Sequence, residues 1–147
     1  DDMMIAAPSD QRLQVIKGEI SAHFDIKDLG RTTHILGIRV SQPSTTTIQL
    51  DQQVYIEATV NRFKDTLSLH LQKDLYTTPL AGKDQLVAST GKADPDKITL
   101  YRQVLGSLNH LSRWTRPDIS LAMSQLGRYQ QNPGEYHFNA LKRVLGY

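Results

Sequence analysis

Helical and strand-like hydrophobic periods alternate along the first fifty residues of the chain. Residues 8–24 carry apolar side chains at intervals of three and four, which predicts a helix. Before it, the short apolar run at residues 3–7 is typical of a strand. Residues 34–40 and 45–50 alternate around a Pro/Ser turn at 41–44, which predicts a β-hairpin. The positions that we expect to face inward in this hairpin are Leu36, Ile38, Val40, Ile48 and Leu50.

The middle of the chain shows one more amphipathic helix and then loses its period. Asp51 is well placed to cap that helix. The expected buried side consists of Val54, Tyr55, Ala58, Thr59 and Phe63. Residues 65–97 show no sustained period, so we expect a long connection with some local order, and a subdomain boundary within it.

The last fifty residues have the pattern of three amphipathic helices joined by short turns. Pro117 separates the first helix from the second, and Asn132, Pro133 and Glu135 form a pattern typical of a third helix start. Such helices should pack as a small bundle. The expected buried stripes are Tyr101, Val104, Leu105, Leu108 and Leu111; Ile119, Ala122, Met123, Leu126 and Tyr129; and Tyr136, Ala140, Leu141, Val144 and Leu145.

These patterns predict an α+β fold: an N-terminal helix and β-hairpin, followed by a mainly helical three-helix bundle. The expected divisions are residues 1–50, residues 51–98 with a helix and a long connection, and residues 99–147 with the bundle. A chain of 147 residues has room for one compact domain or two small subdomains.

Composition narrows the class of protein. The chain has no cysteine, so it has neither disulfides nor thiolate metal sites, which fits an intracellular protein. No run of eighteen apolar residues occurs, so we expect no membrane partner. Residues 99–147 contain six Lys and Arg against two Asp and Glu, whereas residues 1–98 contain eleven against thirteen. The basic end suits either a polyanionic partner or an ordinary solvated helical face.

Several short motifs, in order, resemble those of copia-type retrotransposon reverse transcriptases. Asp1-Asp2-Met3 resembles the end of that family's Tyr-Val-Asp-Asp-Met box, and Lys27-Asp28-Leu29-Gly30 resembles its Lys-Asp-Leu-Gly segment. Each piece alone is weak, but together they span nearly the whole chain. The remaining matches are His34-Ile35-Leu36-Gly37-Ile38, Ile48-Gln49-Leu50-Asp51-Gln52, Tyr55-Ile56, Thr78-Pro79, Tyr101-Arg102, Gly106-Ser107-Leu108, Thr115-Arg116-Pro117-Asp118-Ile119, Pro133, His137, Ala140 and Lys142-Arg143-Val144-Leu145.

The resemblance implies a role in RNA-directed DNA synthesis. Residues 1–50 would be the C-terminal part of the palm with a primer-grip-like hairpin, and residues 99–147 would be thumb. The fingers, most of the palm and the downstream ribonuclease H domain would belong to a longer parent polyprotein. We therefore expect a catalytically incomplete fragment whose partners are an RNA/DNA or DNA duplex and the missing parts of that parent.

The resemblance also implies candidate site residues. Asp1 and Asp2 would be catalytic, with Asp1 the ligand of Mg²⁺ or Mn²⁺ in the intact enzyme, because these hard cations prefer carboxylate oxygens. We expect this fragment to bind no metal by itself, and the plain alternative is two exposed terminal carboxylates. Leu36, Gly37 and Ile38 would contact the primer end, and the alternative is an ordinary hairpin glycine.

Basic side chains in the last third are candidates for phosphate contacts. They are Arg113, Arg116, Arg128, Lys142 and Arg143. Arg116 and Asp118 could instead simply pair across the turn at Pro117. Trp114 could stack on a base or, alternatively, pack the junction between two helices. No other catalytic constellation stands out.

Two further expectations follow from the resemblance. A host-retained remnant, acting as a non-enzymatic nucleic-acid-binding or protein-interaction module, is the alternative to a polymerase fragment. A sheet separated from its neighbouring strands has an open edge, so we also expect self-association through residues 1–50.

Overall fold

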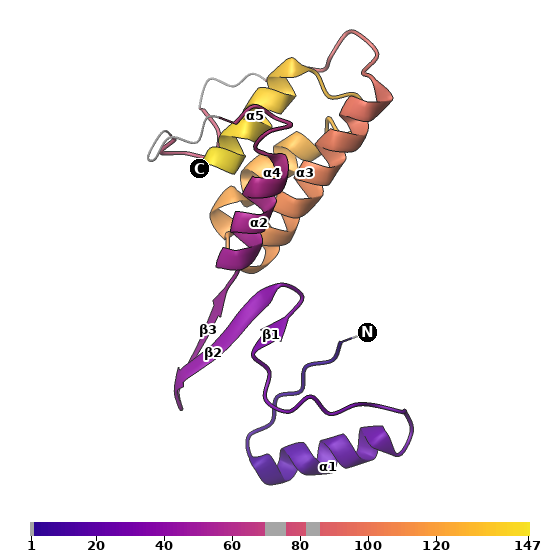
Figure 1. Cartoon of the computed structure of the whole chain (residues 1–147), viewed down its shortest axis with the longest axis vertical. Coiled ribbons are helices and arrows are strands. Elements are labelled where there is room, and N and C mark those ends of the chain that lie inside the picture. The colour runs from indigo at the N-terminus through magenta and orange to yellow at the C-terminus, as the bar shows by residue number, and fades with distance from the viewer. Residues whose placement is uncertain (1, 70–75, 82–85) are drawn as a thin grey trace. The chain divides into compact units, whose positions relative to one another are not determined.

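The computed structural model describes residues 2–69, 76–81 and 86–147, and its elements form two compact units that divide between Asp51 and Gln52 (Figure 1). The first unit holds one helix and a small sheet, and the second is helical. The expected α+β class is therefore confirmed.

The helix of the first unit is α1, Asp10–Ser21. Its N-cap is Ser9, whose side chain accepts a hydrogen bond from the Arg12 N–H at 3.3 Å. The helix is shorter than the predicted range of 8–24, and none of its residues is buried. The predicted strand at residues 3–7 is wrong, because no described strand lies there to pair with the sheet.

The sheet is an antiparallel meander of β1 (His34–Ile35), β2 (Ile38–Ser44) and β3 (Thr47–Asp51). The prediction of one strand over residues 34–40 is corrected, because the chain reverses at Leu36 and Gly37. The predicted turn at 41–44 is also wrong, since those residues continue β2 and the second reversal lies at 45–46.

Proline in β2 is tolerated because the ladder is irregular at that point. Ser41 pairs with Gln49 and Ser44 with Thr47, so Gln42 and Pro43 together face one residue. Proline has no N–H to give to a ladder, and a β-bulge removes the need for one. This irregularity is why Pro43 does not end the strand.

The hairpin has little hydrophobic core of its own. Ile38 is 1% exposed and is the buried apolar residue of the first unit, as far as the structure describes it. Ile48 and Leu50, which the alternation predicts to face inward, are 68% and 45% exposed. The alternation correctly predicts a strand here, but no described element of this unit covers that face.

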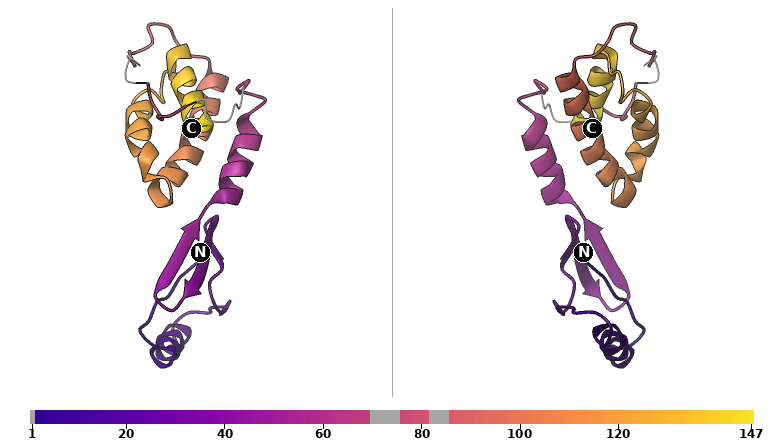
Figure 2. Two further views of the ribbon diagram at one scale, coloured as in Figure 1. Left: turned by 90° about the vertical axis from the view of Figure 1, so that its left-hand side faces the viewer. Right: turned by 90° about the vertical axis from the view of Figure 1, so that its right-hand side faces the viewer.

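Among its described residues the second unit has five helical elements, and α3 packs against each of the other four. They are α2 (Gln53–Phe63), α3 (Pro95–Trp114), the 3-10 helix η1 (Pro117–Ile119), α4 (Ser120–Gly127) and α5 (Glu135–Gly146). Figure 2 shows this unit from two sides. The side chain of Asp94 caps α3 by accepting from an N–H of its first turn, and Pro95 in that turn has no N–H to satisfy.

The buried stripes of α3, α4 and α5 form one core, as the helical spacing predicts. Its members are Phe63, Leu67, Tyr101, Val104, Leu105, Leu108, Leu111, Ile119, Ala122, Met123, Leu126, Ala140, Leu141, Val144 and Leu145. The predicted burial of Tyr136 is wrong, since its side chain is 74% exposed. Tyr129 is half-buried and lies beyond the end of α4.

Two helix starts differ from their predictions. Helix α2 begins after Gln52 rather than Asp51, and it buries Thr59 and Phe63 while Val54 and Ala58 are exposed. Helix α5 begins after Gly134. Asn132 does not cap it, because its side chain binds residues 89–93 instead.

Candidate nucleic-acid interface

The tip of the β1–β2 hairpin is the first candidate contact. Leu36 and Gly37 have φ values of 50° and 76°, as a two-residue turn with two left-handed positions requires. Glycine adopts this conformation freely, whereas a leucine there costs about 1–2 kcal/mol. The turn therefore holds the Leu36 side chain exposed at the tip, beside a backbone that no Cβ shields at Gly37, while Ile38 is buried.

The five basic candidates of the second unit lie on α3 and α5, at the start of η1 and just after the end of α4. Arg113 is in the last turn of α3, and Arg116 immediately precedes η1. Arg128 follows α4, and Lys142 and Arg143 are in α5. The structure separates them into two whose guanidinium groups are bound by other described residues and three whose charged groups are not.

Arg116 is held by Asp118, as the pairing across the turn predicts. Its Nε donates to both carboxylate oxygens at 3.0 and 3.1 Å, and its Nη2 donates to Oδ2 at 2.9 Å. These hydrogen bonds raise the pKa of Arg116 and lower the pKa of Asp118. The guanidinium also lies 5.1 Å from the centre of the Tyr147 ring. Both partners keep their charges at neutral pH, so much of the Arg116 charge is offset locally.

Arg143 fastens the α2–α3 connection to α5. Its Nε donates to the Thr78 carbonyl at 3.0 Å, and its Nη2 donates to the Thr78 hydroxyl at 3.1 Å. Its guanidinium lies 4.7 Å from the centre of the Tyr76 ring. The paired hydrogen bonds to Thr78 and the contact with the Tyr76 ring both depend on the planar guanidinium, so a lysine at this position would not reproduce them.

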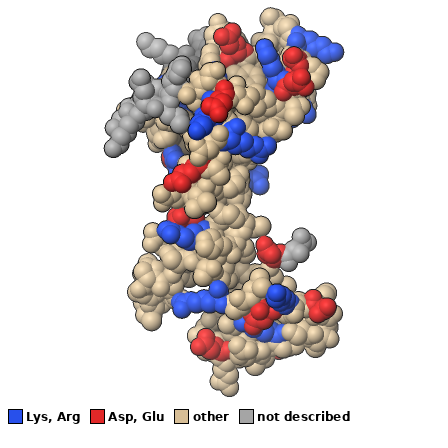
Figure 3. All heavy atoms as spheres, viewed as in Figure 1, with Lys and Arg blue, Asp and Glu red and all other residues tan. Residues whose placement is uncertain are grey.

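Arg113, Arg128 and Lys142 make no hydrogen bond or ion pair with any described residue. Trp114, next to Arg113, is 50% exposed, so half of its surface faces outward at the end of α3. Acidic and basic side chains are interspersed on the face of the molecule seen in Figure 3. The available positive charge is therefore a set of separate side chains rather than one broad basic surface on that face.

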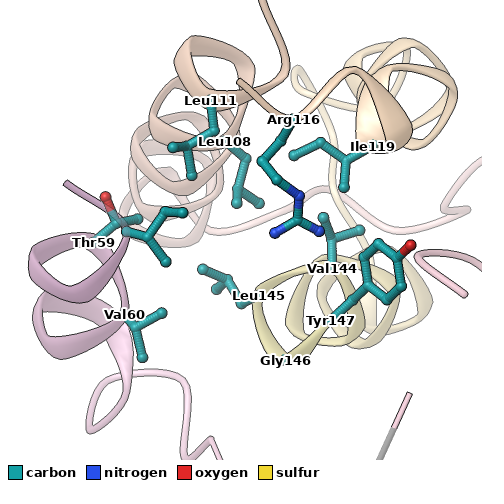
Figure 4. A pocket seen from close by; sticks show the side chains of 11 residues that line it. Thr59, Val60, Leu108, Leu111, Arg116, Ile119, Val144, Leu145, Gly146 and Tyr147 are labelled. Atoms are coloured by element: carbon teal, nitrogen blue, oxygen red, sulfur yellow. The ribbon is translucent and has the colours of Figure 1, made fainter. Parts of the chain in front are cut away.

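A pocket of about 310 Å³ lies within the second unit, between α2 and the ends of α3 and α5 (Figure 4). Thr59 and Val60 line one side, Ile119 and Val144 line the other, and the Arg116 guanidinium points into the space between them. The walls are mainly apolar, and the ion pair with Asp118 already uses one edge of the guanidinium. The described residues that line it include one charged side chain, that of Arg116.

The carboxylate candidates are not brought into a metal site by the described part of the chain. Asp1 lies outside the described residues, and Asp2 is exposed. Over residues 2–69, 76–81 and 86–147, no group of three His, Asp or Glu side chains is arranged to hold a metal ion. The helices of those same ranges include none with the length and hydropathy to cross a membrane.

Sequence reasoning missed the roles of Thr78, Tyr76 and Tyr147. Thr78 and Arg143 are 65 positions apart, and Tyr147 reaches Arg116 from the end of α5. No local spacing signals such pairs. The sequence gives one weak signal for Thr78: Thr78-Pro79 is among the motifs that resemble the family, although no contact is assigned to it.

Comparison with known proteins places the chain in a family. The family described as reverse transcriptase (RNA-dependent DNA polymerase) matches residues 1–75, which is about half of the chain. No solved structure matches.

The curated relatives align with the whole chain. It is 34% identical to a putative transposon Ty5-1 protein of Saccharomyces cerevisiae, covering 46% of that relative. It is 34% identical to the retrovirus-related Pol polyprotein from transposon TNT 1-94 of Nicotiana tabacum, and 32% identical to that from transposon RE2 of Arabidopsis thaliana, covering 11% and 10% of them. The chain thus spans between a tenth and about half of the length of these relatives.

The family match over residues 1–75 and the relatives that align with the whole chain define the class of protein to which this chain is related. The chain belongs to the reverse transcriptase family, and the resemblance to copia-type retrotransposon sequences is confirmed.

Proposed function

We propose that this chain contributes the end of the palm and the thumb of a retrotransposon RNA-directed DNA polymerase. Residues 1–50 would be palm with a primer-grip-like hairpin, residues 51–98 a helix and connection, and residues 99–147 thumb. The observation that carries the proposal is the reverse transcriptase match over residues 1–75, continued by Pol polyprotein relatives along the whole chain. The small sheet followed by packed helices supports it.

The proposed ligand is a primer–template duplex, either RNA/DNA or DNA. Arg113, Arg128 and Lys142 would bind its phosphates, because their charges are not engaged by described residues. Trp114 and the tip at Leu36 and Gly37 would add contacts to bases or to the primer end. Arg116 and Arg143 would act mainly by holding η1 and the α2–α3 connection in place.

Catalysis would require other parts of a Pol polyprotein. Reverse transcription uses divalent metal ions, and Asp1 and Asp2 are the proposed catalytic carboxylates, with Mg²⁺ or Mn²⁺ bound at Asp1. The described residues do not assemble three ligands, so they do not by themselves fit such a site. We propose that the chain alone binds duplex without polymerising DNA.

Fluorescence anisotropy with a short RNA/DNA hybrid and a matched DNA duplex, across a salt series, tests the proposal. We expect binding without sequence preference that weakens steeply with salt, because phosphate contacts release counterions. Absence of binding at low salt would contradict it.

Single substitutions locate the surface. Arg113→Gln, Arg128→Gln and Lys142→Gln should each lower affinity and reduce the salt slope by about 0.9 for each phosphate that the variant no longer neutralises. Lys97→Gln is the matched control, since it removes one exposed charge from the first turn of α3. Equal decreases in all four variants would mean that net charge, rather than this surface, determines affinity.

A further inference from the structure

Residues 86–93 of the α2–α3 connection are fastened to the corner between α4 and α5. The Tyr129 hydroxyl donates to the Leu86 carbonyl. The Asn132 side chain accepts from the Ala93 N–H at 2.7 Å and donates to the carbonyls of Ser89 and Gly91 at 3.3 and 2.8 Å. Two corner side chains therefore hold a segment that has no helix or strand of its own.

His137 stabilises this corner from beneath. It is 1% exposed, and its ring stacks on Tyr129 with centroids 4.0 Å apart and an interplanar angle of 18°. Its Nδ1 accepts a hydrogen bond from the Gly134 N–H at 2.8 Å. A nitrogen that accepts this bond carries no proton, so the docked structure requires the neutral ring with its proton on Nε2.

The corner and the segment approach each other closely at Gly134, the residue whose N–H donates to His137. A Cβ placed on Gly134 would lie 3.3 Å from both the Cβ and the hydroxyl of Ser89. The Gly134–His137 hydrogen bond therefore lies beside Ser89 of the segment. A protonated ring would put an N–H at Nδ1 against the N–H of Gly134, and two donors cannot share that position.

The surroundings of His137 also disfavour a charge. Burial lowers its pKa, and the backbone of Val87 opposes this effect only in part, since Nε2 makes no well-formed hydrogen bond. Tyr129 is the titratable side chain in ring contact with it. Within the described residues, neither Lys92 of the segment nor Glu135 of α5 forms an ion pair with the ring.

We propose that His137 is a proton-sensitive latch, which keeps residues 86–93 docked on the α4–α5 corner while it is neutral and releases them when it is protonated. The rest of the helical unit stays folded, because its buried core is formed by α2, α3, η1, α4 and the inner face of α5, and no residue of 86–93 belongs to that buried set. Neither the family match nor the proposed duplex binding assigns this device.

The direction of the pH effect follows from the lowered pKa of docked His137. The released segment leaves the ring exposed, with an ordinary pKa near 6.5, so the released state binds the proton more readily. Docking is therefore most favoured above about pH 6.5 and weakens as the pH falls below it. One proton changes the docking equilibrium by up to about tenfold per pH unit in that window.

Amide hydrogen exchange of the full chain between pH 7.5 and 5 tests the latch. The amide of Ala93 is the main reporter, because its hydrogen bond to Asn132 exists in the docked state. Its protection factor, corrected for intrinsic exchange, should fall by up to about tenfold per pH unit below 6.5, while amides of α3 keep theirs. No change at Ala93, or a simultaneous loss over α3 and α4, would overturn the proposal.

Substitutions separate the latch from general acid sensitivity. His137→Asn keeps a short acceptor for Gly134 but cannot titrate, so the protection of Ala93 should become independent of pH. His110→Asn, in α3, is the matched control and should keep the pH response of the native chain. Tyr129→Phe removes the bond to Leu86 and should lower protection at every pH without removing the slope. The proposal is overturned if the protection of Ala93 still depends on pH in His137→Asn. If that variant fails to fold, the proposal is overturned when His110→Asn loses the pH dependence of Ala93.

Discussion

Tyr101 illustrates how a single side chain does more in the structure than its pattern predicts. It is fully buried, it donates a hydrogen bond to the Leu126 carbonyl at 2.9 Å, and it meets the Phe138 ring edge-on. Burial raises the pKa of its phenol, so it stays neutral and remains a donor throughout the physiological range. The hydroxyl thus connects α3 to the end of α4, while the ring fills the core.

Removing that hydroxyl should lower stability without emptying the core. We expect Tyr101→Phe to reduce the free energy of unfolding by about 0.5–1.5 kcal/mol, the net value of one hydrogen bond. Tyr136→Phe, at an exposed position of α5, should change it by less than about 0.5 kcal/mol. Urea denaturation followed by circular dichroism measures both, and equal effects would show that the hydrogen bond to Leu126 contributes nothing.

At the scale of elements, α3 organises the helical unit and α5 organises the connection. The 20-residue α3 contacts the other helical elements of its unit, and the Thr115 hydroxyl just after it donates to the Gln52 side chain at 2.8 Å. Helix α5 holds the connection through Arg143 and through a close approach of Gly146 to Tyr76. The two helices therefore respond differently to glycine substitution.

Gly106→Ala and Gly146→Ala test this difference. Gly106 lies inside α3 with open space around it, so alanine should raise the free energy of unfolding by about 0.5–1 kcal/mol through helix propensity. At Gly146 a Cβ would lie 2.9 Å from the Tyr76 ring, so the same change should give no gain or a loss. Equal stabilisation in thermal unfolding would contradict the close packing of Tyr76 on α5.

At the scale of the whole molecule, the hydrophobic core is very unevenly distributed. The buried apolar cluster belongs to the second unit, whereas the described residues of the first unit bury Ile38 and leave Ile48 and Leu50 exposed. The sheet has β1 and β3 as its outer strands, and each therefore has an unpaired edge among the described residues. Open edges and uncovered apolar faces favour association with another polypeptide.

We accordingly predict that the chain self-associates through its first unit. Sedimentation velocity should show an average mass that rises with protein concentration. Ile48→Lys, which places a charge on the exposed face of β3, should weaken the association. Val54→Lys, at a position of α2 that is 77% exposed against 68% for Ile48, should not weaken it. A monomer at all concentrations would contradict the prediction.

Much of the helical unit could be predicted from the sequence because its signals are local. The spacing of the buried residues in α3, α4 and α5 follows from the helical repeat, and Pro117 marks the break between α3 and α4 through its own chemistry. The pairing of Arg116 with Asp118 was likewise predictable, since the two residues flank a single proline in the sequence. The family resemblance depends on short motifs in a fixed order, and these can be recognised in the sequence without knowledge of the fold.

The tertiary structure decided what depends on distant partners. It placed the first reversal of the sheet at Leu36 and Gly37, because the backbone there adopts left-handed conformations that alternation alone does not reveal. In the folded unit Arg143 donates a hydrogen bond to Thr78. The charged groups of Arg113, Arg128 and Lys142 have no hydrogen-bond or ion-pair partner among the described residues. It also joined Asn132 and His137 to the corner that holds residues 86–93. Periodicity reports which face of an element is apolar, whereas the partner of a polar side chain is set by how the elements pack.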